Sequence, residues 1–286
     1  MLKYGMRGHD IAVHQPMETA FSKMETLGIT RIQLAMDKTI SDLDFSVGSY
    51  TPSKAQQIRE SLLRHHIELP VLSCYINPAD PDEGQRKQAV ARFIETMRYA
   101  KVLGAGLVGT ETGRASSDMS ITPLTESEDC YQRVLKSFSE IAEEAESLNV
   151  QVGVEGVFSH TLSTPEKMDR FLREIGSSKF SVILDAANLI RPSLAGDSAA
   201  ISRVIGEAFD RYGDRIQVLH IKDCIYTDAW TQKCTPPGEG IMDFSMLMHL
   251  VRKSGRDFPA ILEESTPARF SKDARFFERA YEMAGI

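Results

Sequence analysis

The chain has 286 residues, 42% of them hydrophobic, and a formal net charge of -7. This length fits one barrel domain as well as two small domains, and the acidic balance argues against nucleic-acid or anionic-membrane partners held by a broad basic surface. The four cysteines are scattered without a CxxC pair, and neither an apolar leader nor a membrane-spanning run is present. We therefore expect a cytoplasmic protein with reduced thiols.

The first half of the chain alternates strand-like and helix-like runs. Helix limits are indicated by Pro residues at the opening turns and by Gly28 and Gly104 after the last turns. The polar segment 114–125 has no period, which predicts a loop over one face of the domain. In chain order the predicted elements are strand 3–6, helix 16–27, strand 31–36, helix 52–66, strand 69–74, helix 83–103 and strand 107–111.

The second half continues this alternation to the last residues. Thr164 is predicted to cap a helix that has Pro165 at its first position. A loop that contains Trp230 and residues 236–240 is predicted before the helix that begins at about residue 244. The elements are helix 126–148, strand 151–155, helix 165–175, strand 180–185, helix 199–212, strand 216–220, helix 244–254, strand 259–263 and helix 269–283.

Eight strands and eight helices in strict alternation predict an α/β fold, a single (β/α)8 TIM barrel that spans residues 1–286. A doubly wound open sheet is the main rival. The first strand–helix turn carries no GxGxxG phosphate cradle to favour that alternative.

Four successive strands end in a side chain that can bind a metal: Glu155, Asp185, His220 and Glu263. One such carboxylate is more often a helix cap or a surface charge, but four of these groups beside apolar strands are costly to desolvate unless they are paired or coordinated. Because parallel strands in a barrel end on one face, a shared divalent cation explains all four together. The mainly oxygen donor set favours Mn2+ or Mg2+, with Zn2+ and Co2+ as alternatives.

Two glutamates are adjacent at the last of these strand ends. Because side chains alternate along a strand, only one of the two should point into the barrel mouth. We expect Glu263 to do so and Glu264 to face the helix layer or a loop.

Other side chains near the strand ends are candidates for substrate binding. His160 either orients a substrate hydroxyl or is an ordinary loop histidine. Lys222 either approaches substrate oxygens or pairs with Asp223 or Glu239. Glu111, His9 and Cys74 follow strands four, one and three, where they are expected to form pocket wall rather than to act as catalysts.

Two further residues have competing interpretations. Trp230 stacks on a sugar or packs in the core. Arg86, with the other basic residues of the helix 83–103, is expected to belong to a solvated face.

A family resemblance rests on six motifs: VEG around Glu155, HTLSTPEKM from His160, ILDAANL around Asp185, HIKD from His220, PPGEG at 236–240 and ILEES around Glu263. With them the chain resembles the sugar isomerase/epimerase superfamily, which has the xylose-isomerase-like barrel. The resemblance implies a metal-dependent ketose 3-epimerase or aldose–ketose isomerase. It makes Glu155, Asp185, His220 and Glu263 the metal ligands, with both glutamates also moving the proton. Asn188 stands where the epimerase branch usually has a substrate-contacting histidine.

Isomerisation and epimerisation of a sugar require the same groups. Moving a proton next to a carbonyl needs an electrophile that stabilises the enediolate, a base on one face and an acid on the other. The expected substrate is a carbohydrate, either a free sugar, a sugar acid or a sugar phosphate, although no phosphate cradle is evident.

Two other functions are weighed against this one. A metal-dependent DNA phosphodiesterase like the abasic-site endonucleases of the same superfamily would need several strand-end histidines and a basic face. A non-catalytic sugar-binding barrel would have no need of the paired glutamates. The sequence leaves the oligomeric state open, and a homo-oligomer is compatible with it.

Overall fold

The computed structural model describes residues 1–285 and shows a closed barrel of parallel strands. The strand order is β1-β10-β7-β6-β5-β4-β3-β2, and β1 closes the barrel by pairing with both β10 and β2. The barrel strands are β1 (Leu2–Arg7), β2 (Arg31–Leu34), β3 (Glu68–Ser73), β4 (Leu107–Glu111), β5 (Val152–Glu155), β6 (Phe180–Asp185), β7 (Ile216–Ile221) and β10 (Phe258–Leu262). The predicted TIM barrel is confirmed.

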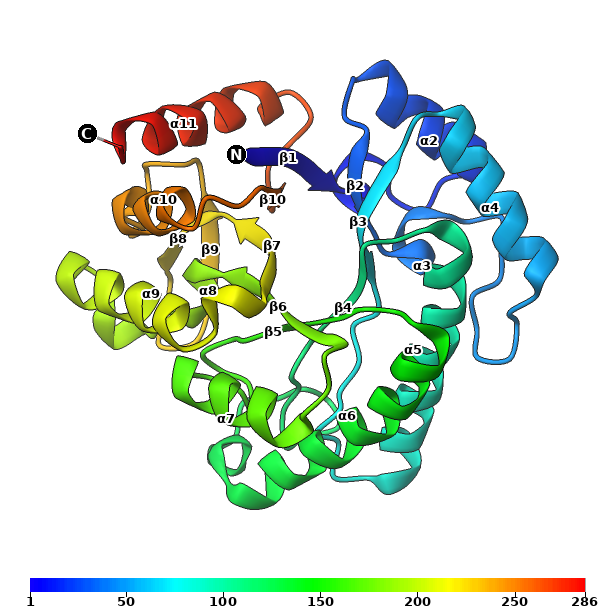
Figure 1. Ribbon diagram of the computed structural model, residues 1–286, viewed down its shortest axis with the longest axis horizontal. Coiled ribbons are helices and arrows are strands. Elements are labelled where there is room, and N and C mark those ends of the chain that lie inside the picture. Colours follow the sequence, from blue (N-terminus) through cyan, green and yellow to red (C-terminus); the bar gives the residue numbers. More distant parts are fainter. Residues whose placement is uncertain (286) are drawn as a thin grey trace.

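Helices surround the barrel (Figure 1). The outer ones are α2 (Met17–Thr26), α4 (Pro52–Arg64), α5 (Glu83–Leu103), α6 (Glu128–Leu148), α7 (Pro165–Ile175), α9 (Ser198–Tyr212), α10 (Phe244–Lys253) and α11 (Phe270–Met283). Shorter helices are α1 (Gly8–Ile11), α3 (Met36–Thr39) and α8 (Ala186–Leu189), with 3-10 turns η1 (Pro123–Glu126), η2 (Pro192–Leu194) and η3 (Gly213–Arg215). Thr51 and Thr164 cap helices as predicted.

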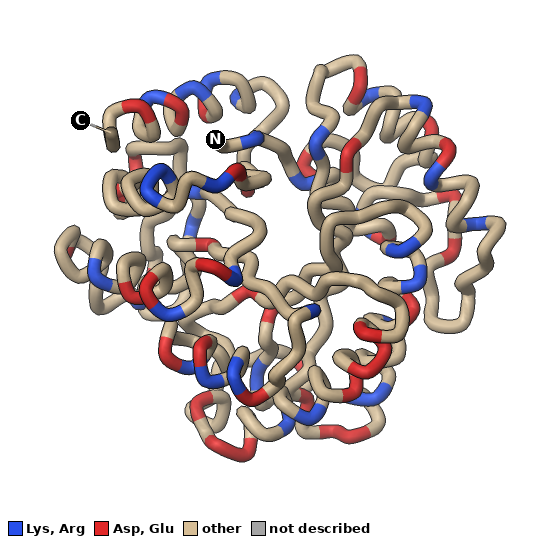
Figure 2. Tube along the Cα trace, viewed as in Figure 1, with Lys and Arg blue, Asp and Glu red and all other residues tan. Residues whose placement is uncertain are grey.

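Charges of both signs are mixed over the ring of outer helices (Figure 2). Among residues 1–285, no helix combines the length and the apolar character needed to cross a membrane.

A layer of apolar side chains fills the barrel below the strand ends. This layer consists of Val71, Leu107, Ile183, Val218 and Ile261. Three of its members lie two residues before a predicted metal ligand, so they share that ligand's face of the strand. At Gly109 and Gly153 an added Cβ would lie 2.7–2.9 Å from side chains of this layer, so glycine makes room for it. The barrel interior is therefore a packed floor beneath the strand ends.

The segment around Trp230, which is predicted to be a loop, contains an antiparallel hairpin, β8 (Asp223–Tyr226) and β9 (Gln232–Thr235). The carboxylate of Asp223 anchors the return from this hairpin, because it accepts the backbone N–H groups of Gly238 and Gly240, both at 2.9 Å, and of Met242 at 3.1 Å. The prediction of a plain loop was wrong here, since backbone pairing and one buried carboxylate order the segment.

Arg86 also differs from its prediction. Its side chain is fully buried, and it donates hydrogen bonds to Glu83 and Glu140 and, at 3.0 Å, to Ser137 on α6. The expected solvated position was wrong because the Arg86 side chain packs between α5 and α6, where the carboxylates of Glu83 and Glu140 balance the guanidinium charge.

Candidate metal centre and adjoining cavity

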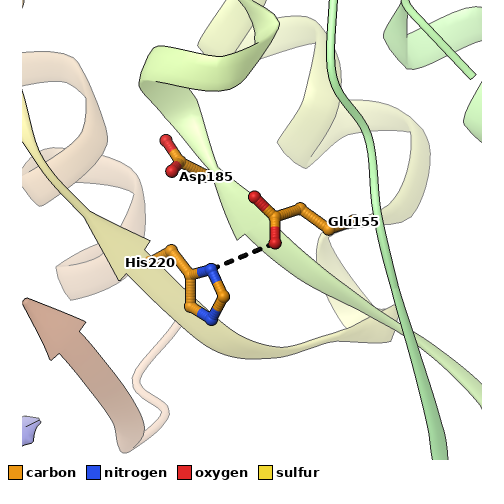
Figure 3. Close-up of side chains that lie close together, drawn as sticks. All are labelled: Glu155, Asp185 and His220. Carbon is orange, nitrogen blue, oxygen red and sulfur yellow. Dashed lines mark ion pairs between the residues drawn. The ribbon is translucent and has the colours of Figure 1, made fainter. Parts of the chain in front are cut away.

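The ends of β5, β6 and β7 bring Glu155, Asp185 and His220 together (Figure 3). One donor atom from each lies within 4.8 Å of the others, and all three side chains are buried. Asp185 and His220 are direct register partners on neighbouring strands, which explains their proximity. This group could hold a metal ion.

Glu263, from the end of β10, faces the same group. His220 Nδ1 lies 3.1 Å from Glu155 Oε2 and 3.2 Å from Glu263 Oε1. Octahedral coordination with metal–ligand bonds of about 2.2 Å separates neighbouring donor atoms by about 3.1 Å, so these spacings suit one hard cation. Neither ring nitrogen of His220 makes a hydrogen bond of good geometry with residues 1–285. The charges of Glu155 and Glu263 outweigh burial and raise the pKa of this ring to about 9, so a cation would have to displace its proton before the ring could act as a ligand.

Lys222 supplies a buried positive charge beside these carboxylates. Its Nζ lies 2.8 Å from Asp185 Oδ2 and 3.0 Å from Glu263 Oε2. The alternative in which Lys222 pairs with Asp223 or Glu239 was wrong, because the lysine points into the barrel mouth. Burial would lower the pKa of the ammonium, but the charges of Asp185, Glu263 and Glu155 outweigh it and raise this pKa well above its ordinary value.

The neighbouring groups respond to burial and to each other's charge. Burial raises the pKa of Asp185 to about 6, against the opposing charge of Lys222. Burial also works to raise the pKa of Glu263, but Lys222, His220 and Arg7 outweigh it and leave that pKa below its ordinary value. Glu263 is therefore the carboxylate that these cations hold in its ionised form.

Asn188 orients two of the carboxylates. Its Nδ2 donates to Glu155 Oε1 at 2.7 Å, and its backbone N–H donates to Asp185 Oδ1 at 3.1 Å. Asn188 also reaches the cavity above the centre, so it touches both the candidate ligands and the space where a ligand would lie.

A cavity of about 480 Å³ opens above this centre. Six of the predicted side chains line it: His9, Glu111, His160, Asn188, Lys222 and Glu263. Sequence reasoning missed Arg7, Lys38, Tyr75 and Arg114, which line it as well. Of these, Arg7 could have been found from the same strand-end rule, because it is the last residue of β1.

Cys74, expected at the barrel mouth, instead lines a separate small cavity that includes Arg92 and Tyr99. The next residue, Tyr75, lines the mouth. Consecutive side chains in an extended segment point to opposite sides, so placing Tyr75 inward turns Cys74 outward.

The adjacent glutamates follow the prediction only in part. Glu263 is buried, whereas Glu264 is exposed, has a φ of 55° and receives a 2.6 Å hydrogen bond from Arg7. Glu264 nevertheless also lines the cavity. The alternation rule does not reach Glu264, because β10 ends at Leu262 and the chain turns after it.

Glu111 and His160 lie on the side of the cavity formed by β4 and the segment after β5. Burial, with the charges of Glu155 and Glu263, raises the pKa of Glu111 to about 7. Burial, with the charge of Arg114, lowers the pKa of His160 to about 3. The His160 ring is therefore neutral, and Glu111 changes charge near neutral pH.

We expect Glu111→Gln to stabilise the metal-free protein above neutral pH. The folded-state pKa of about 7 exceeds the ordinary 4.5, so ionising Glu111 costs free energy that accumulates as the pH rises between these values and stays constant above them. The variant should unfold at a higher temperature than wild type at about pH 8 and at the same temperature at about pH 4. Thermal unfolding in a chelator, with Glu143→Gln on the exposed face of α6 as control, measures this. An equal gain at both pH values would contradict it.

Comparison with known proteins gives a family. Residues 21–280 match the sequence model of the family described as xylose isomerase-like TIM barrel. An inosose dehydratase of Lacticaseibacillus casei is 21% identical in an alignment of 246 positions that covers 78% of each chain.

Solved structures share the fold over nearly the whole chain. A D-tagatose 3-epimerase-like protein superposes with a TM-score of 0.76 at 17% identity and covers 99% of this chain and 98% of its own. A xylose isomerase-like TIM barrel protein from Mycobacterium smegmatis, in complex with magnesium, gives 0.72 at 13% identity and covers 98% and 97%. At these identities the likeness concerns the fold.

Proposed function

The chain belongs to the family of xylose isomerase-like TIM barrels, and we propose that it is a divalent-metal-dependent sugar isomerase or epimerase that moves a proton on a carbon next to a carbonyl. One observation carries the proposal: Glu155 and Glu263 approach His220 Nδ1 from two different strands, at 3.1 and 3.2 Å. A substrate above this centre would have a carboxylate available from each side.

The proposed metal ligands are Glu155, Asp185, His220 and Glu263. A cation held there, Mn2+ or Mg2+ by its oxygen-rich donor set and Co2+ or Zn2+ as alternatives, would polarise the substrate carbonyl. Donor atoms of Glu155, Asp185 and His220 that lie within 4.8 Å of one another support three of these ligands, and the 3.2 Å distance from Glu263 Oε1 to His220 Nδ1 supports the fourth.

The chain's own carboxylates move the proton. Glu263, held ionised by nearby cations, is suited to remove a proton from one face of the reacting carbon, and Glu155 to return one to the other. Asn188 orients Glu155 for that step through its 2.7 Å hydrogen bond. The substrate-contacting residues in this proposal are Lys222, Asn188, His160, Glu111 and His9, all of which reach the cavity.

Solvent exchange tests the proposal. Purified protein loaded with Mn2+ or Mg2+ and incubated in D2O with free ketoses, ketonic sugar acids and ketose phosphates should incorporate deuterium at the inverted or isomerised carbon of at least one substrate, because the abstracted proton exchanges with solvent. NMR and mass spectrometry locate the label. Product formation without label at that carbon, or cleavage of abasic DNA instead, would overturn the assignment.

A second candidate is a dehydratase, which begins with the same proton removal and then expels a neighbouring hydroxyl as water. Two observations favour it: the curated relative is an inosose dehydratase, and Glu111, whose pKa is about 7, lies in the cavity where it could protonate the departing hydroxyl. Loss of one water from the product separates this reaction from isomerisation, which leaves the mass unchanged.

A further inference from the structure

A second cavity of about 600 Å³ adjoins the one above the metal centre. The segment after β5 separates them: Val157 faces the first cavity, Phe158 and Ser159 face the second, and His160 lines both. Both volumes fall in the range of about 300–1,000 Å³ typical of small-molecule pockets, so each is large enough for one unit of a ligand.

The second cavity contains an aromatic platform. Trp230, at the tip of the β8–β9 hairpin, stacks on Phe158 with ring centroids 6.4 Å apart and an angle of 9° between the rings. Phe158 is buried, whereas Trp230 remains 51% exposed. Asp228 fixes the tip by accepting the backbone N–H groups of Trp230 at 2.8 Å and Thr231 at 2.9 Å. One face of the indole is thus supported, and much of the ring stays accessible.

A charged pair lies in the same cavity. Arg191, from the segment between α8 and η2, donates to Glu126, in η1, at 2.8 Å, and to Ser163 at 3.3 Å. Both bonds leave from Nη2, so within residues 1–285 the N–H groups of Nε and Nη1 have no protein acceptor. The cavity therefore offers donors on a planar guanidinium, a carboxylate acceptor and an exposed aromatic ring.

These groups match the chemistry of a sugar ring. The C–H face of a sugar packs on an aromatic ring, while neighbouring hydroxyls use a donor and an acceptor held side by side. An acyl chain would leave Arg191 and Glu126 without hydrogen-bond partners from the ligand. The charged pair therefore favours a polar, ring-shaped occupant.

We propose that this second cavity is a subsite for a second sugar unit, so that the preferred substrate is a glycosylated ketose and not a free monosaccharide. The proposal rests on the function proposed for the first cavity, since it places the reacting ketose above the metal centre and the attached sugar against Trp230. His160, which lines both cavities, would lie beside the glycosidic link.

The single tryptophan makes binding directly observable, because Trp230 is the only one in the chain. Emission of the Mg2+-loaded protein is titrated with fructose, with methyl glucoside, and with glucosyl-fructoses that differ only in linkage: maltulose, leucrose and isomaltulose. At least one disaccharide should shift the emission saturably and bind at least ~10-fold more tightly than either single sugar, since it engages both cavities.

Matched variants locate the subsite. Arg191→Met and Glu126→Gln, each of which removes one charge of the pair, should weaken that disaccharide ~10-fold and leave fructose unchanged. Lys233→Met, at an exposed position of β9, should change neither. Equal affinities for the disaccharides and the single sugars, or unchanged disaccharide affinity in both pair variants, would overturn the subsite.

The two proposals fail in different ways. If a disaccharide binds tightly at Trp230 but no sugar takes up deuterium, the result supports the subsite and contradicts the isomerase or epimerase assignment. Deuterium uptake into fructose with no preference for a disaccharide does the reverse.

Discussion

Glu263→Gln and Glu155→Gln are expected to lower turnover by at least ~10²-fold while binding of a divalent cation remains measurable. Glutamine keeps the shape of the side chain and one oxygen ligand but cannot take up a proton. Turnover of the substrate identified by solvent exchange, with cation affinity measured by calorimetry, tests both parts. Deuterium uptake without product in one variant would assign proton removal to the glutamate that this variant retains.

Glu264→Gln is the matched control for these variants. Glu264 is adjacent to Glu263 and also lines the cavity, but it is exposed and bonded to Arg7 instead of lying against His220. Its turnover should stay within a few-fold of wild type. Near-normal turnover in both Glu263→Gln and Glu155→Gln, or a loss at Glu264 as large as at Glu263, would show that the proton-transfer pair is misassigned.

Lys222→Met is expected to destabilise the metal-free protein strongly and to increase the stabilisation gained on adding a divalent cation. Removing one partner of a buried ion pair costs roughly 3–5 kcal/mol, because the remaining charges stay buried without compensation. Asp185 and Glu263 would lose their contacts with the ammonium at 2.8 and 3.0 Å. An added cation replaces that positive charge.

Thermal unfolding with a chelator and with added Mg2+ measures both effects. Lys101→Met, at an exposed position near the end of α5, serves as control and should behave like wild type in both conditions. If the cation stabilises Lys222→Met no more than wild type, then the lysine and the cation do not neutralise the same carboxylates.

The strand-end pattern predicted that Glu155, Asp185 and His220 would lie close together, because strand register fixes which residues are neighbours. Asp185 pairs with His220 and Glu111 pairs with Glu155 in neighbouring parallel strands, so residues that each end a strand are brought to one level of the barrel. Length and alternation also predicted the barrel. The limits of α5 and β4 were predicted to the residue.

What the sequence did not reveal depends on contacts between distant segments. The β8–β9 hairpin is held by Asp223, whose backbone partners lie up to nineteen residues further along the chain. Arg86 is buried because α6 packs on α5, which a single-helix pattern cannot show. Trp230 was assigned either to a sugar or to the core, and its stacking on Phe158 with half of its surface exposed follows from the hairpin that carries it.

The apolar layer inside the barrel closes the lower end of the cavity, so the cavity does not continue through the barrel. Ile183, Val218 and Ile261 close the barrel below the strand ends, while the cavity lies above them. Any ligand that binds at the bottom of the cavity must pass through the space that a sugar would fill. A cation at the buried carboxylates would therefore bind before the sugar and could not leave while the sugar is bound. The shape of the cavity would thus impose an ordered binding sequence.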